Sequence, residues 1–258
     1  MSRSPVAIVR AESARFRHPL LLVHGLWTGA WIWRGFAAYV AHRGWDSWAP
    51  TLLDDPETAD ATARLDRLRD VVRDLDEPPI VVTHDAGLVT AARLGADAEF
   101  PAVVALNPVL SPVDVGEPQC FRWPQFWYAR WFGERVAPPA GSMARRLVAG
   151  TGVSSEWRAD SAAFFRDVAT SRSALLPESF AAAGLIVAST GDPMLSSAGA
   201  ADLARRRGWS YEASDAPGHF PMLQPGWEGL ADRIHRWIVR TLGEDLLLFL
   251  DRESDASD

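Results

Sequence analysis

The chain has 258 residues, of which 48% are hydrophobic, so it is long enough for one domain with a large core and an insertion. Its net charge of −7, without a run of basic residues, argues against nucleic acid or an anionic membrane as a partner. All 26 residues counted as Lys or Arg are arginine, which excludes a lysine base or Schiff base, and the single Cys120 excludes an intrachain disulfide and a cysteine-rich metal site.

The N-terminal residues 1–5 are polar and lack the apolar region of a signal peptide. No apolar run reaches the roughly 18 residues of a membrane span. The six histidines lack the tight spacing of a metal site. We therefore expect a cytoplasmic protein with a small-molecule substrate and with no cofactor, metal, nucleic acid or membrane partner; the oligomeric state is left open.

Strand and helix patterns alternate along the first part of the chain. A helix over Thr58–Leu75 is expected to bury a stripe that contains Leu65, Leu68, Val72 and Leu75. The β-branched run Ile80–Thr83 is typical of a central parallel strand. The other expected strands are Val6–Val9, Leu20–Val23, Trp45–Ala49 and Ala102–Leu106, and the other expected helices are Trp31–His42 and Ala86–Leu94.

The same alternation returns near the C-terminus. Strands are expected at Leu185–Ala188 and Ser210–Ala213, and helices at Ala198–Arg207 and Gly229–Leu242. The last helix has one apolar face, formed by Leu230, Ile234, Trp237, Ile238 and Leu242. Together these elements predict an α/β fold with a mostly parallel central sheet flanked by helices.

Residues 111–180 interrupt this pattern between two strands and are too many for a simple crossover loop. We interpret them as a helical cap over the carboxyl ends of the strands, on a core formed by residues 1–110 and 181–258. An insertion whose aromatic residues pack only on each other is the alternative. Its aromatic residues are Phe121, Trp123, Phe126, Trp127, Tyr128, Trp131, Phe132 and Trp157.

Four short motifs follow expected strands. His24-Gly25-Leu26-Trp27 follows Leu20–Val23, and Thr83-His84-Asp85-Ala86-Gly87 ends the central strand in a turn of small residues. Gly191-Asp192-Pro193 and Gly218-His219-Phe220 follow the two C-terminal strands. An acid that orients a histidine, beside a nucleophile or base, is the arrangement that acid–base and nucleophilic catalysis require.

These motifs, in this order, resemble those of the α/β-hydrolase family over nearly the whole chain. The resemblance implies that Asp85 occupies the nucleophile position, that Asp192 orients His219, and that an oxyanion hole is formed by the backbone N–H groups of Ala86 and of Leu26 or Trp27. Two carboxylates beside one imidazole are expected to raise the pKa of His219.

The substrate is expected to contact the loop and the cap. The candidate residues are His24, Trp27, Trp127, Tyr128 and Trp131. For His24, as for His84, holding a loop by hydrogen bonds is the simpler interpretation. The three cap aromatics fit a protein core as well as a pocket.

Aspartate in place of the usual serine decides which reactions are plausible. Attack of a carboxylate on an ester or amide carbonyl would give a high-energy anhydride, which disfavours ordinary esterase chemistry. Attack on an sp³ carbon gives a stable alkyl ester, and a carboxylate can also transfer protons.

Asp85 at this position resembles haloalkane dehalogenases and epoxide hydrolases, which pass through such an ester. This chain differs from them because Ala86 replaces a tryptophan that commonly follows the nucleophile. Only Tyr128 lies in the cap, where epoxide hydrolases use two tyrosines, and Trp27 replaces the proline of their oxyanion loop.

The loop His24–Trp31 is instead similar to that of small esterases and hydroxynitrile lyases. Acetate-eliminating members of tetronate polyketide pathways, in secondary metabolism, are a further resemblance. Our leading hypothesis is therefore a lyase, in which Asp85 removes a proton and His219 protonates a leaving carboxylate. The alternatives are hydrolysis of an epoxide or halide through an Asp85 ester, and a non-catalytic binder of small molecules.

Overall fold

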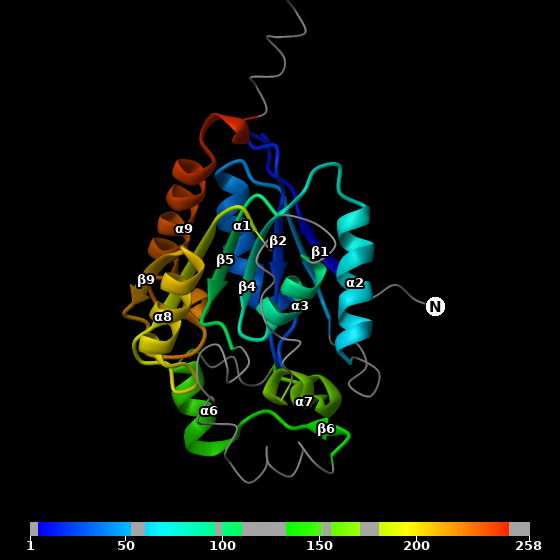
Figure 1. The fold of residues 1–258 in the computed structure, drawn as a ribbon, viewed down its shortest axis with the longest axis vertical. Coiled ribbons are helices and arrows are strands. Elements are labelled where there is room, and N and C mark those ends of the chain that lie inside the picture. The colour runs from blue at the N-terminus through cyan, green and yellow to red at the C-terminus, as the bar shows by residue number, and fades with distance from the viewer. Residues whose placement is uncertain are drawn as a thin grey trace, which may run out of the picture.

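A computed structural model describes residues 5–52, 60–95, 100–109, 133–149, 151, 156–170 and 181–247. Their main feature is a seven-stranded sheet with the strand order β1-β3-β2-β4-β5-β8-β9 (Figure 1). The first strand is antiparallel to its neighbour, and all other neighbouring strands are parallel. The expected mostly parallel sheet is thereby confirmed. Its strands are β1 (Val6–Val9), β2 (Leu20–Val23), β3 (Ser47–Pro50), β4 (Ile80–His84), β5 (Val103–Leu106), β8 (Gly184–Ser189) and β9 (Ser210–Ser214).

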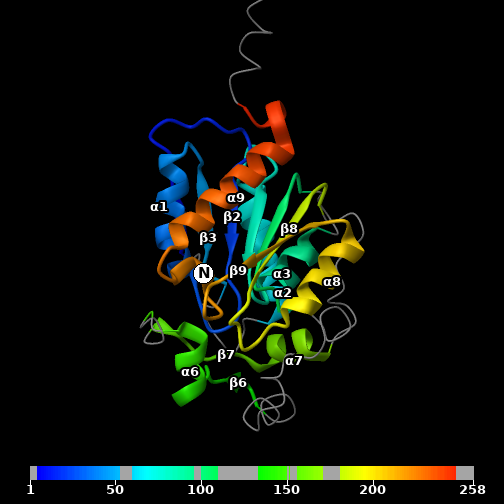
Figure 2. The ribbon, with the colours of Figure 1, turned by 90° about the vertical axis from the view of Figure 1, so that its left-hand side faces the viewer.

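Helices cover both faces of the sheet, as Figure 2 shows: α1 and α9 lie on one side, and α2, α3 and α8 on the other. Strands β2, β4, β5 and β8 are consequently buried along their whole length, which explains why their sequences are continuous apolar runs. The predicted helices are confirmed to within a few residues. Their bounds are α1 (Arg34–His42, after a 3-10 turn at Ala30–Trp33), α2 (Ala61–Arg73), α3 (Gly87–Leu94), α8 (Ser197–Arg207) and α9 (Trp227–Leu242).

The buried face of α2 differs from the predicted one. Arg64, Leu68 and Val71 are buried, whereas Leu65 and Val72 are only partly buried. The helix is turned so that a charged residue faces inward, because the Arg64 guanidinium pairs with the buried carboxylate of Asp160. The apolar spacing correctly predicted the helix and the burial of Leu68, and Leu65 and Val72 pack against the core, but the spacing did not predict that Arg64 is buried beside them.

Four short elements lie beyond the carboxyl ends of the parallel strands, at the lower end of Figure 1. They are β6 (Arg135–Val136), α6 (Gly141–Val148), β7 (Asp160–Ser161) and α7 (Ala162–Thr170), and β6 pairs with β7 in an antiparallel sheet of their own. All four belong to the insertion expected to form a cap. The remaining predicted substrate contacts of that insertion, Trp127, Tyr128 and Trp131, lie outside the described residues, so the cap as a unit stays a prediction.

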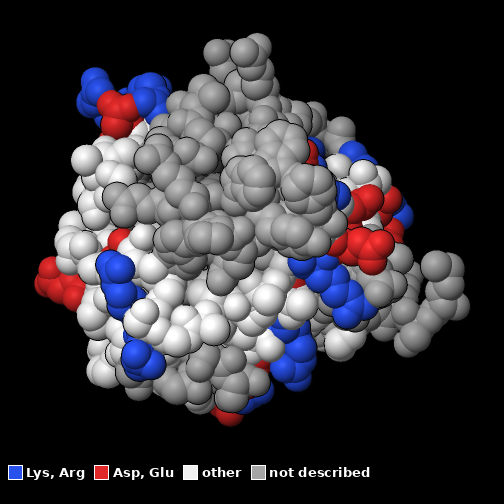
Figure 3. Space-filling view, turned by 90° about the horizontal axis from the view of Figure 1, so that it is seen from below, with Lys and Arg blue, Asp and Glu red and all other residues white. Residues whose placement is uncertain are grey.

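Figure 3 views the molecule from this lower end. Its described surface carries small groups of blue and red side chains rather than one field of a single sign. Among the described helices, none combines the length and the apolar character that crossing a membrane requires.

Candidate active site

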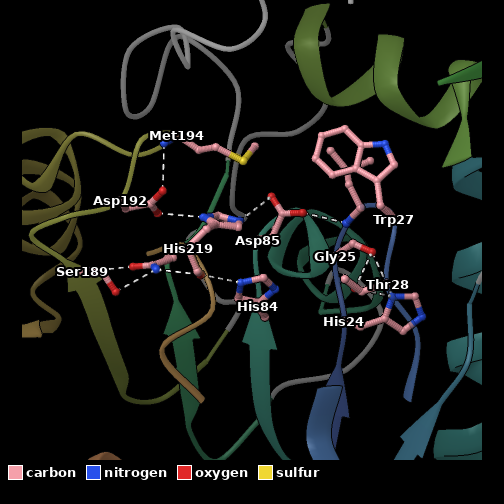
Figure 4. Close-up of polar contacts among 12 residues, drawn as sticks. His24, Gly25, Trp27, Thr28, His84, Asp85, Ser189, Asp192, Met194 and His219 are labelled. Atoms are coloured by element: carbon pink, nitrogen blue, oxygen red, sulfur yellow. Dashed lines mark hydrogen bonds and ion pairs between the residues drawn. The ribbon is translucent and has the colours of Figure 1, made fainter. Parts of the chain in front are cut away.

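The candidate residues gather at one edge of the sheet because parallel strands end on the same side. The His24–Thr28 loop follows β2, and Asp85 follows β4 directly. Asp192 and His219 come after β8 and β9, the two strands at the far side of the sheet. In Figure 4, Asp192, His219 and Asp85 form one row, with the loop after β2 at its end.

Asp85 occupies a sharp turn between β4 and α3, with a positive φ of 54° that few residues other than glycine adopt. Its Oδ2 accepts a hydrogen bond of 2.6 Å from the Leu26 N–H. Gly25 makes this contact possible, because a Cβ at that position would lie 2.3 Å from the same Oδ2. The turn therefore presents a buried carboxylate with one oxygen held by the loop after β2.

The other oxygen of Asp85 faces His219. Oδ1 lies 3.7 Å from His219 Nε2, and neither atom has a hydrogen-bond partner. On the opposite side of the imidazole, Nδ1 donates to Asp192 Oδ2 at 2.7 Å, and Asp192 Oδ1 accepts from the Met194 N–H at 2.8 Å. The geometry brings together the three residues that the sequence singled out, with His219 oriented by Asp192 and open toward Asp85.

His219 carries a strongly raised pKa. Burial by itself would lower it, but the charge and hydrogen bond of Asp192, together with the charge of Asp85, outweigh burial and raise the pKa to about 10. At neutral pH the imidazole is therefore a cation between two carboxylates.

The main chain of His219 is also held firmly. Its carbonyl oxygen accepts hydrogen bonds from His84 Nε2 at 2.9 Å and from Asn107 Nδ2 at 2.8 Å. Asn107 also accepts from the Ser189 N–H through Oδ1 at 2.6 Å, which links β5 to β8. Burial and the nearby His219 charge lower the pKa of His84 to about 4, so that His84 is a neutral positioning group.

His24 holds the loop after β2. The Leu52 N–H donates to its Nε2 at 2.8 Å, so its Nδ1 carries the proton and donates to the Gly25 carbonyl at 2.9 Å. Burial, reinforced by the charge of Arg64, lowers its pKa to about 3. Both ring nitrogens are engaged, which leaves His24 no polar atom for a substrate and supports the simpler of its two interpretations.

Trp27 is tied to residues of the insertion rather than to Asp85. Its N–H donates to Asp160 Oδ2 at 2.8 Å, its indole N–H donates to the Val136 carbonyl at 3.2 Å, and its own carbonyl accepts from the Arg158 N–H at 3.0 Å. Of the two loop donors considered from the sequence, only Leu26 reaches Asp85. The backbone of Ala86, beside Asp85 at the start of α3, remains the second candidate donor.

Sequence reasoning missed three residues around this site: Asn107, Asp160 and Arg64. Asn107 had a weak signal, because asparagine at the end of a buried strand often adopts a positive φ, here 43°. Asp160 and Arg64 had none, since their pairing joins segments 96 residues apart. Among the described residues, no group of three or more His, Cys, Asp or Glu is arranged to hold a metal ion.

The raised pKa of His219 makes a prediction for stability. Because the folded pKa of about 10 exceeds the ordinary 6.5, the stabilising contribution of His219 is complete below pH 6.5 and is lost as the pH rises toward 10. The free energy of unfolding in urea should therefore fall across this range. His219→Gln should flatten this decline, whereas His42→Gln, on the exposed end of α1, should not. An equal decline in His219→Gln would contradict the prediction.

Comparison with known proteins adds to this geometry. A family model described as the alpha/beta hydrolase family matches residues 20–232, a span that contains Asp85, Asp192 and His219. A search of curated proteins found no match.

Solved structures share the architecture. The chain is similar to a monoacylglycerol lipase of Paleococcus ferrophilus, with 17% identity, coverage of 92% of this chain and 99% of that one, and a TM-score of 0.68. It is also similar to a soluble variant of the monoglyceride lipase from Saccharomyces cerevisiae, with 11% identity, coverage of 92% of this chain and 91% of that one, and a TM-score of 0.74. A thermophilic esterase from Thermogutta terrifontis is 15% identical, with coverage of 92% of this chain and 94% of that one and a TM-score of 0.67. At these identities the likeness concerns the fold.

Proposed function

Because the chain belongs to the alpha/beta hydrolase family, we propose that it is a hydrolase whose Asp85 forms an alkyl ester with the substrate. A member of this family is an enzyme, and the site indicates its class of reaction. We rank ester formation above the elimination that the sequence favoured. The reason lies in how the carboxylate of Asp85 is held.

The hydrogen bond from the Leu26 N–H to Asp85 Oδ2 carries the proposal. Once Oδ1 has attacked an sp³ carbon and the bond to the leaving group has broken, Oδ2 is the carbonyl oxygen of the ester. Water then loses a proton to His219 and attacks the ester carbonyl carbon, and the negative charge develops on Oδ2. The donor that stabilises this charge is therefore in place before the reaction begins. Collapse of the intermediate releases the product alcohol and restores the Asp85 carboxylate.

The protonation of His219 agrees with a two-step reaction. Before the first step, two carboxylates hold its proton. Ester formation removes the negative charge of Asp85, so the imidazole can then release the proton and serve as the base for water. An epoxide can accept the His219 proton, because ring opening produces a strongly basic alkoxide. A halide leaves as a weakly basic anion and does not take up the proton.

Of the described residues beside Asp85, neither Ala86 nor Trp27 offers a side-chain donor to a halide. Ala86 has no polar side chain, and the Trp27 indole N–H already donates to the Val136 carbonyl. We therefore place an epoxide ahead of an alkyl halide. The insertion over residues 111–180, with its aromatic residues, would form the wall of a pocket for an apolar, oxygenated small molecule.

Elimination is a second candidate, for one specific reason. His219 Nε2 and Asp85 Oδ1 face each other at 3.7 Å, so a protonated acid and a carboxylate base lie on the same side of a bound substrate. This suits removal of a proton and a carboxylate from neighbouring carbons. The Leu26 hydrogen bond weakens the case, because the Leu26 N–H already donates to Asp85 and so is not available to an enolate.

Isotope labelling distinguishes the two reactions. The wild-type protein is incubated in ¹⁸O-water with an aryl epoxide, a primary alkyl bromide and a β-acyloxy ketone. After turnover, the mass of the peptide that contains Asp85 is measured by mass spectrometry. Hydrolysis through the ester should place ¹⁸O in the Asp85 carboxylate, because water attacks the enzyme carbonyl. Product formation with an unlabelled Asp85 would overturn the proposal, and an unsaturated product would then favour elimination.

A further inference from the structure

Asp160 lies where three separate parts of the chain meet. It belongs to β7 of the cap elements and is completely buried. Its Oδ2 accepts from the Trp27 N–H at 2.8 Å, and its Oδ1 accepts from the Ser161 N–H at 2.7 Å and from the Arg64 guanidinium of α2. One carboxylate therefore connects the loop after β2, a core helix and the cap.

Arg64 makes this burial tolerable. A buried carboxylate is costly unless it is paired and hydrogen-bonded. The Arg64 side chain is 1% exposed, pairs with Asp160, and has its Cζ 4.0 Å from the ring centroid of Phe164, a residue of α7. The pair is thus enclosed between α2 and the cap elements, away from solvent.

The contact acts on a strained part of the loop. Trp27 has a positive φ of 60°, an unfavourable conformation for a large side chain, so it has to be maintained by its surroundings. Trp27 is held by hydrogen bonds with Val136, Arg158 and Asp160, among other contacts. The next residue back along the chain is Leu26, whose N–H donates to Asp85 Oδ2.

We propose that Asp160 is a positioning residue that holds the oxyanion loop in place from the cap, and that it thereby governs hydrolysis of the Asp85 ester. The inference rests on the proposed function. It assigns Asp160 mainly to the second half of the reaction. The Leu26 N–H stabilises only the share of the carboxylate charge on Oδ2 before Oδ1 attacks, but the whole negative charge on Oδ2 when water attacks the ester. A loosened loop should slow this step more than the attack by Oδ1, so the ester should accumulate.

The test uses two changes at Asp160. Asp160→Asn keeps the shape but removes the charge that Arg64 requires. A double variant, Asp160→Leu with Arg64→Met, removes the pair altogether; replacement of a buried ion pair by apolar residues is often neutral for stability, so this variant guards against a folding failure. Asp167→Asn is the matched control, since Asp167 of α7 pairs with Arg93 of α3 without touching the loop.

The first measurement is amide hydrogen exchange without substrate. The Leu26 and Trp27 amides should exchange at least about tenfold faster in the double variant, relative to the amides of β5 in the same sample, and at the wild-type rate in Asp167→Asn. Unchanged exchange in the double variant would overturn the proposal, whatever the reaction of the enzyme.

The second measurement is intact mass during turnover of a compound that labels Asp85 in His219→Gln. Both Asp160 variants should accumulate the Asp85 ester with His219 intact, and turnover should fall about 10- to 100-fold, less than the complete loss of an oxyanion donor causes. A proportionate loss of activity without ester would mean a merely structural role and would overturn the proposal. If the wild type converts a compound that does not label His219→Gln, the proposed function is wrong, and faster loop exchange alone then supports the positioning role of Asp160.

Discussion

Replacing His219 with glutamine is expected to stop turnover and to leave the substrate attached to Asp85. The glutamine cannot accept a proton from water, so an ester that has formed should persist. The bromide should form this ester without help from residue 219, because it leaves as an anion, whereas the epoxide should form it more slowly without the His219 proton. General-base catalysis contributes about 10²- to 10⁴-fold, and turnover should fall by an amount at the upper end of that range. Intact mass after incubation with the epoxide, bromide and acyloxy ketone panel should show one adduct, which peptide mapping should place on Asp85.

The control for this experiment is His42→Gln, an equivalent change on the exposed end of α1. It should turn over normally and show no adduct. A His219→Gln protein that remains free of adduct while the wild type converts a compound would mean that Asp85 does not form an ester. If His219→Gln also loses all activity without forming an adduct, the result would favour a role for His219 as the acid of an elimination.

Replacing Asp85 with asparagine is expected to reduce activity by about 10⁴-fold or more, because both proposed reactions need its negative charge. The fold should survive, since asparagine tolerates the positive φ of 54° and its side-chain oxygen can still accept from the Leu26 N–H. Steady-state kinetics on the compound that the wild type consumes, with circular dichroism as a check on folding, measures both.

The same variant should lower the pKa of His219. The negative charge of Asp85 contributes to the raised value, whereas Asp192 would remain. Titration of the imidazole by NMR should therefore give a pKa between the wild-type value of about 10 and the ordinary 6.5. Asp66→Asn, on the exposed side of α2, should leave both activity and pKa unchanged. An unaltered His219 pKa in Asp85→Asn would show that the two groups are not coupled.

The local sequence was sufficient for most of the fold. Continuous apolar runs predict buried parallel strands, and the 3.6-residue spacing of apolar side chains predicts the helices between them. Asp85, Asp192 and His219 could be assigned to one place because each follows a strand, and parallel strands end at the same edge of the sheet. For these residues, order along the chain and the end of a strand are enough to determine proximity.

The two departures share a cause. In α2 the predicted residues Leu65 and Val72 do pack against the core but are only partly buried, and Arg64, which the apolar stripe did not include, is fully buried. For Trp27 the sequence allowed an oxyanion donor, but its N–H is taken by Asp160. Both outcomes depend on the carboxylate of Asp160, which lies far from Arg64 and Trp27 along the chain. No local sequence pattern predicts such a partner.

The sequence by itself determined the class of fold, the three candidate catalytic side chains and the excluded chemistries, because composition, periodicity and position after a strand are local properties. Tertiary structure decided how Asp85 is held: Oδ2 rests on Leu26 while Oδ1 faces His219. It also decided that Asp160 and Arg64 meet behind the loop. Hydrogen bonds of this kind depend on the separation and angle of groups on different elements, and these are set only when the sheet, the helices and the cap elements have packed together.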